Sequence, residues 1–233
     1  AYLKAVAYNR IKYTKQHGYG LYERWVEEFV PRLQETGNLG TDWWKVILLR
    51  EAINAFPHAE YFWFLDEKSL IVQRDIPIEN FLLDPEIMQA KMLRDQPIVL
   101  PGSAIKTYKN TKAQDVSLIL TQNNVGISTD SIIVKNDIQG KATLEYWDSR
   151  LYRAYKNFYQ DEVKALEHML QWHPLVLSRT SLVPTRLINA GIENKDQKKN
   201  SAVDYQEGDM VINLGECQRD GSCIKLASKY LRS

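Results

Sequence analysis

An apolar run from Tyr61 to Leu65, followed directly by Asp66, is the feature that most constrains this chain. A short run of aromatic and aliphatic residues predicts a buried strand. Open α/β sheets bind ligands at the carboxyl ends of such strands, where a carboxylate suits a hard cation or the phosphates that the cation carries. Asp66 is therefore a candidate ligand-binding residue. The alternative is that Asp66 only caps the turn or helix that follows.

Length and charge restrict the class of protein. The chain has 233 residues, of which 44% are hydrophobic and 11% aromatic, enough for one large α/β domain or two small ones around a substantial core. The formal net charge of +1 gives no reason to expect a nucleic-acid partner. No run of eighteen apolar residues and no signal peptide is visible, and the chain opens at Ala1 without a methionine. We therefore expect an excised luminal or cytosolic domain.

Helical and strand patterns alternate along the chain. Thr41 and Asp42 are expected to cap a helix from Trp43 to Phe56, which Pro57 ends. Further helices are expected over 10–16, 141–155 and 161–172, and further strands over 98–101, 116–121, 131–134 and 210–214. This order predicts an α/β sheet with a mostly parallel part.

The familiar short active-site motifs are missing from the sequence. There is no GxGxxG, P-loop, HExxH or GxSxG pattern, and the four histidines lack metal-ligand spacing. Cys217 and Cys223 flank a loop-like segment whose length permits a disulfide. Two free thiols in a cytosolic protein are the alternative.

A series of short segments, taken in order, carries a resemblance that covers nearly the whole chain: His17-Gly18-Tyr19, Trp44-Lys45, 62–66, 126–136, 165–170 with His173-Pro174, 186–189 and 208–217. Together they resemble the retaining glycosyltransferase family of fungal α-1,6-mannosyltransferases, α-galactosyltransferases and plant xyloglucan xylosyltransferases. The fungal α-1,6-mannosyltransferase complex subunits are the most similar members. Each segment alone is weak, but the ordered set is specific.

The resemblance implies a GT-A-like (Rossmann-like) mixed sheet flanked by helices, in a single catalytic-type domain over residues 1–233 that lacks the family's first strand. It also implies a nucleotide-sugar donor. In the family, an Asp-x-Asp pair at the end of the central strand and a late histidine hold Mn²⁺ on the diphosphate. The cation neutralises the negative charge that builds on the leaving nucleoside diphosphate.

The chain departs from this family pattern in the expected donor site. Asp66 matches the first aspartate, but Lys68 stands at the second and Asn213 at the late histidine. Ser128 and Asp130 replace an asparagine and a glycine of the middle motif. Gln122-Asn123 stands where the family commonly has Gln-Asp. Lys68 could supply positive charge in place of the metal.

These matches predict one donor pocket, built from the end of the 61–65 strand, the turn before 131–134 and the 210–214 strand. The expected catalytic residues are Asp66, Gln122, Asn123 and Asp130, and the expected donor-binding residues are Asp66, Lys68, Ser128 and Asn213. Asp66 is also the expected, weakened Mn²⁺ ligand. Lys68 and Asn213 should reduce the dependence on manganese, because an ammonium repels the ion and an amide is a poorer ligand than imidazole.

Three functions are open at this point. The first is transfer of mannose from GDP-mannose to an α-1,6-mannan or N-glycan acceptor with an altered metal motif. The second is a non-catalytic or weakly catalytic subunit of a mannosyltransferase complex. The third is a transferase that uses UDP-galactose or UDP-xylose.

The resemblance also carries expectations about place and partners. It implies a protein of the Golgi lumen, anchored by an N-terminal transmembrane helix outside this chain, within a hetero-oligomeric glycosyltransferase complex. The family pattern pairs Cys217 with Cys223, and an oxidising lumen favours that disulfide.

Overall fold

The computed structural model of the protein describes residues 1–99, 101–158, 161–192, 200, 202–215, 217 and 221–231. Its β-strands form two sheets. The larger sheet has the order β1 (Tyr61–Leu65), β4 (Ile127–Lys135), β3 (Leu118–Gln122) and β5 (Thr180–Leu182). β4 is antiparallel to both of its neighbours, whereas β3 and β5 are parallel. The smaller sheet has the order β2 (Ser69–Ile71), β7 (Val211–Asn213) and β6 (Ala190–Gly191), with only β6 and β7 parallel.

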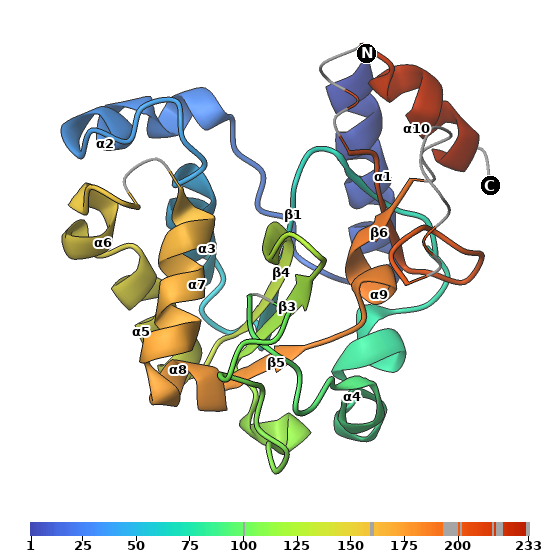
Figure 1. Ribbon diagram of the computed structural model, residues 1–233. Helices are drawn as coiled ribbons and strands as arrows, with labels where there is room; N and C mark the ends of the chain where they lie inside the picture. The colour runs from blue at the N-terminus through green and yellow to red at the C-terminus, as the bar shows by residue number, and fades with distance from the viewer. Residues whose placement is uncertain are drawn as a thin grey trace.

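Helices cover both sides of this arrangement (Figure 1). On one face of the larger sheet lie α3 (Trp44–Ala55), α5 (Ile138–Trp147) and α7 (Glu162–Trp172). The remaining helices are α1 (Tyr2–His17), η1 (Val26–Phe29), α2 (Val30–Glu35), η2 (Glu79–Leu83), α4 (Pro85–Lys91), η3 (Ala113–Asp115), α6 (Arg150–Ala154), α8 (Pro174–Ser178), α9 (Thr185–Asn189) and α10 (Cys223–Leu231). The expected α/β architecture with a mixed sheet is confirmed, but the prediction of a mostly parallel part is wrong, because among the described strands only one pair in each sheet is parallel.

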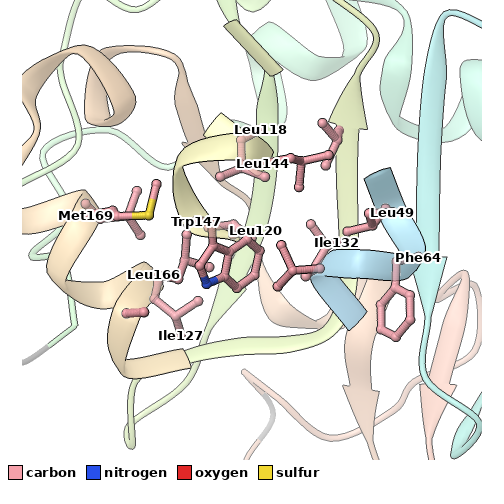
Figure 2. Packing of buried hydrophobic residues seen from close by; sticks show 14 of the residues in the cluster. Leu49, Phe64, Leu118, Leu120, Ile127, Ile132, Leu144, Trp147, Leu166 and Met169 are labelled. Carbon is pink, nitrogen blue, oxygen red and sulfur yellow. The ribbon is translucent and has the colours of Figure 1, made fainter. Parts of the chain in front are cut away.

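β1 is buried on both faces, which explains why its sequence is a continuous apolar run. Phe62 and Phe64 join the largest hydrophobic cluster, between the larger sheet and helices α3, α5 and α7 (Figure 2). The alternate residues of β1 pack against a second cluster on the opposite face. Burying one such phenylalanine contributes roughly 1.5–3 kcal/mol. The packing of β1 on both faces therefore fixes the position of the strand and of Asp66, which follows it.

Some predicted elements differ from the structure. No strand forms at 98–99, where Val99 has a positive φ of 73°, and Leu100 lies outside the described residues. The helix predicted over 141–155 is two helices, α5 and α6, separated at Asp148 and Ser149. α1 begins at Tyr2, well before the predicted residue 10, and ends where Gly18 adopts the left-handed conformation.

The smaller sheet packs with α1 and α10 around a separate, smaller cluster. Within it, a disulfide joins Cys217 and Cys223, whose Cα atoms are 4.8 Å apart, so the expected bridge is present. The bridge ties the segment after β7 to the start of α10. Of the helices described, none is both long and apolar enough to cross a lipid bilayer.

Candidate functional site

Asp66 and Asp130 lie side by side where β1 meets β4. The N–H of Asp66 donates to the carbonyl of Asp130 over 2.9 Å, which continues the β1–β4 pairing one residue beyond Leu65. Asp66 is only 4% exposed. Burial alone would raise its pKa, but a hydrogen bond with Glu67 and the charges of Lys45 and Lys68 outweigh burial and hold the pKa of Asp66 below its usual range.

Lys45 compensates these carboxylates from inside the protein. Its ammonium lies 3.0 Å from Asp42 Oδ2 and 3.1 Å from Asp66 Oδ2, and its side chain is 2% exposed. Asp130 Oδ1 and Glu162 Oε1 are 3.8 and 3.9 Å away. Burial would lower the pKa of Lys45, but these carboxylates together raise it above its usual value. Lys45 is therefore a permanent buried cation.

Lys45 was not predicted from the sequence as a site residue, because lysines are seldom fully buried. A signal was nonetheless present. Lys45, Leu49 and Ala52 follow the spacing that places side chains on one face of a helix, and all three are buried. A lysine on the buried stripe of a helix requires an acidic partner.

Lys68 and Asn213 reach Asp130 from the smaller sheet. Asn213 pairs with Ser69 across β2 and β7, so it lies next to Lys68. The Lys68 ammonium is 3.2 Å from Asp130 Oδ1, and the Asn213 amide donates to Asp130 Oδ2 over 2.9 Å. The N–H of Lys68 also donates to Asp66 Oδ1 over 3.3 Å. Asp130, a residue of the larger sheet, thus receives polar contacts from two residues at the edge of the smaller sheet.

Ser128 joins the group through Asn189, a residue that the sequence analysis did not select. The Asn189 amide donates to Ser128 Oγ over 2.9 Å and accepts a hydrogen bond from Asn213 over 2.9 Å. Ser128 and Asp130 lie within β4, so the prediction that they occupy a turn before the strand is wrong. The structure therefore brings Asp66, Lys68, Ser128, Asp130 and Asn213 together.

Gln122 does not join this group, contrary to the expectation that it belongs to the donor pocket. Its side-chain oxygen accepts from the N–H of Val99 over 2.7 Å, and its amide nitrogen donates to the carbonyl of Pro97 over 3.0 Å. Asn123 accepts from the backbone of Val125 and Gly126 and so closes the turn before β4. The Gln122 side chain therefore stabilises the loop at residues 97–99.

An open cleft of about 620 Å³ lies beside the charged group. It is lined by residues at the start of α3, by Asn123 and the following segment 125–130, and by the start of α7. Asp42, Lys45 and Asp130 are among its lining residues, whereas Asp66, Lys68 and Asn213 are not. The volume is within the range of small-molecule sites.

Glu162, at the start of α7, is a second residue that the sequence analysis missed. Its Oε1 accepts a hydrogen bond from Thr129 Oγ1 over 2.9 Å, and its side chain is 5% exposed. Burial raises the pKa of Glu162 to about 7, although Lys45 and Thr129 oppose the shift. Glu162 can therefore exchange a proton near neutral pH at the edge of the cleft.

The donor set as arranged does not fit a manganese ion. Asp66 has Lys45 at Oδ2 and the N–H of Lys68 at Oδ1, and both oxygens of Asp130 also have nitrogen partners. Within the described part of the chain, no three His, Cys, Asp or Glu side chains are grouped to hold a metal. A divalent ion 4 Å from one ammonium would be opposed by about 8 kcal/mol at an effective dielectric constant of about 20.

Comparisons with known proteins identify related sequences. The sequence model described as the galactosyl transferase GMA12/MNN10 family matches residues 1–224. The probable alpha-1,6-mannosyltransferase MNN11 of Saccharomyces cerevisiae is 33% identical over 94% of this chain and 54% of its own length. An uncharacterized alpha-1,2-galactosyltransferase of Schizosaccharomyces pombe, C1289.13c, is 28% identical over 98% of this chain and 60% of its own length. The chain thus spans little more than half of these relatives.

A solved structure gives an independent comparison of the fold. The crystal structure of a glycosyltransferase involved in the glycosylation of the major capsid of PBCV-1 aligns with a TM-score of 0.56. The alignment covers 96% of this chain and 92% of that chain at 12% identity, so it concerns the fold alone. The expected GT-A-like mixed sheet flanked by helices is confirmed.

Proposed function

Because the chain belongs to the galactosyl transferase GMA12/MNN10 family, a family of glycosyltransferases, we propose that it transfers mannose from GDP-mannose to an α-1,6-mannan or N-glycan acceptor. Mannose is favoured over galactose because MNN11, at 33% identity, is named a probable alpha-1,6-mannosyltransferase. Transfer proceeds with retention of the anomeric configuration, as the resemblance implies.

The meeting of Asp66, Lys68 and Asn213 at Asp130 is the observation that carries this proposal. These residues come from distant parts of the sequence, and Asp130 is also one of the residues that line the cleft of about 620 Å³. A purely structural role for Asp66 as a cap would not require Lys68 and Asn213 to converge on the neighbouring carboxylate.

The charges of the site suit the proposed chemistry. Cleavage of the bond between mannose and the diphosphate builds negative charge on the leaving nucleoside diphosphate. A cation that is already in place stabilises that charge. The Lys68 side chain is 25% exposed, whereas that of Lys45 is 2% exposed, so Lys68 is the more accessible of these two cations. The acceptor hydroxyl attacks from the same face, and the departing phosphate takes its proton.

The setting of the protein is part of the proposal. The Cys217–Cys223 disulfide supports an oxidising compartment, and we place the protein in the Golgi lumen. We also propose that a membrane anchor outside this chain holds the protein there, and that the protein is part of a hetero-oligomeric glycosyltransferase complex.

Transfer assays with a panel of GDP-mannose, UDP-galactose and UDP-xylose test the proposal. We expect transfer from GDP-mannose, and its loss in Asp66→Asn, which keeps the size of the side chain but removes its charge. Asp115→Asn is the matched control, since Asp115 is half exposed and pairs only with Arg179 in the described structure. Transfer from a UDP-sugar alone would replace the assigned donor.

A second candidate function is a non-catalytic subunit of a mannosyltransferase complex. It is favoured by one observation, that Lys45 and Lys68 already neutralise the carboxylates of the site. The two functions separate when Asp66→Asn is measured in the assembled complex. Unchanged transfer in that variant would place the chemistry on another chain.

A further inference from the structure

Three departures from the family pattern contact one another in the structure. Asp130, which stands at a glycine of that pattern, receives the Lys68 ammonium at 3.2 Å and the Asn213 amide at 2.9 Å. Lys68 and Asn213 stand at the second aspartate and the late histidine. The two positions that hold a metal in the family pattern are thus occupied by Lys68 and Asn213, and the Asp130 carboxylate contacts both of these residues.

Lys68 differs from Lys45 in its access to solvent. The Lys68 side chain is 25% exposed and that of Asp130 is 21% exposed, whereas that of Lys45 is 2% exposed. The Lys68 ammonium is also paired with the Asp130 carboxylate at 3.2 Å, which favours its charged form. Lys68 is therefore a permanent cation at an open position.

Asp130 fixes where that cation stands. Its other oxygen is held by Asn213, which in turn donates to Asn189. This leaves the Asp130 carboxylate with little freedom to rotate. The Lys68 ammonium is thereby directed to the end of β1, next to Asp66, where a divalent ion would otherwise be expected.

We propose that Lys68, Asp130 and Asn213 act as one unit that takes the place of a divalent cation, with the Lys68 ammonium binding the diphosphate of the nucleotide-sugar donor. The inference rests on the proposed function, because it takes the ligand to be a nucleoside diphosphate. In this unit Asp130 is a positioning residue and Lys68 is the residue that touches the ligand. Donor binding is then independent of manganese.

Calorimetric titration of the protein with GDP, in chelator and in Mn²⁺, tests this independence. We expect equal affinity in both solutions. Lys68→Met should weaken GDP binding by roughly ten- to hundredfold, the usual effect of losing a charged hydrogen bond. Lys106→Met is the matched control and should bind GDP as the parent does, because Lys106 pairs with Asp95, away from the cleft.

A reciprocal variant asks whether the unit can be exchanged for a metal site. Lys68→Asp, Asp130→Gly and Asn213→His together restore the residues of the family pattern. Electron paramagnetic resonance of free Mn²⁺, without nucleotide, should detect metal binding to this variant but not to the parent. GDP binding to the variant should then require Mn²⁺. Should the triple variant fail to fold, Lys68→Met still decides the role of the lysine.

The outcomes separate the inference from the proposed function. GDP binding to the parent that appears only with Mn²⁺, or that survives Lys68→Met unchanged, overturns the inference and leaves the function standing. A parent that binds neither GDP nor UDP in either solution overturns both. Manganese-independent GDP binding that Lys68→Met weakens by the expected ten- to hundredfold supports both.

Discussion

The two sides of the site differ in how firmly they hold their lysine. On the side of the larger sheet, the side chain of Lys45, a residue of α3, is buried among four carboxylates, next to the largest hydrophobic cluster. On the side of the smaller sheet, Lys68 pairs with Asp130 and remains partly exposed, above a smaller cluster that contains a disulfide. A lysine thus stabilises the fold on one side of the site, whereas on the other side a lysine is accessible to a ligand.

Removing the buried lysine should have the largest effect on stability. Lys45→Met leaves Asp66 and its neighbours as uncompensated buried charges, so the free energy of unfolding should fall by about 3–5 kcal/mol. Denaturant unfolding of the variant and the parent measures this loss. A decrease in the free energy of unfolding below about 1 kcal/mol, the usual contribution of an exposed ion pair, would mean that Lys45 stabilises the fold no more than an exposed lysine does.

The proton affinity of Glu162 should make the larger-sheet side sensitive to pH. Its pKa is raised from 4.5 to about 7, chiefly by burial, so the folded state binds this proton more tightly than the unfolded chain does. Its contribution is therefore fully present below pH 4.5 and is lost as pH rises through 7, by about 3 kcal/mol in total. Glu162→Gln should lack this part of the pH dependence when unfolding is measured at about pH 5 and about pH 8. The same slope in the variant as in the parent would place the titration elsewhere.

The disulfide should matter only on the smaller-sheet side. Replacing both cysteines, Cys217→Ser with Cys223→Ser, should reduce stability by about 2 kcal/mol because the closed loop is short. Hydrogen exchange should quicken in β7 and α10, while β1 and α3 stay protected. Equal loosening of both sides would mean that the two sheets open as one unit.

Removing the exposed lysine should affect stability least. Lys68→Met should cost under about 1 kcal/mol, since Asp130 keeps its hydrogen bond from Asn213 and its proximity to Lys45. The measurement is the same denaturant unfolding as for Lys45→Met, so each variant is the control of the other. A large loss of stability would assign Lys68 to the framework instead of the ligand.

The sequence was most informative where a local pattern decides the structure. The apolar run of β1 and the amphipathic repeat of α7 are found close to their predicted positions, and the ordered segments identify the family. At the site, Asp66, Lys68, Ser128, Asp130 and Asn213 meet as expected. Their meeting depends on strand pairing between distant segments, which the resemblance supplied and periodicity could not.

What the sequence did not yield depends on tertiary contacts. Gln122 was predicted to belong to the donor pocket, but its side-chain amide forms hydrogen bonds with the backbone of residues 97 and 99. Lys45 and Glu162 were not selected: helix spacing could indicate that Lys45 is buried, but the carboxylates around Lys45, Glu162 among them, come together only once α3, β4 and α7 pack. The break between α5 and α6 likewise accompanies the side chain of Asp148, which pairs with Arg50 and Arg153 from two different helices.

A crystal structure of the protein with GDP-mannose, grown in chelator, would show whether Lys68 binds the donor diphosphate without a metal. The account predicts that the donor diphosphate lies within hydrogen-bond distance of the Lys68 ammonium, while Lys45 stays between Asp42 and Asp66. A diphosphate bound away from Lys68, or a donor that enters the crystal only with a metal held by Asp66, would contradict it.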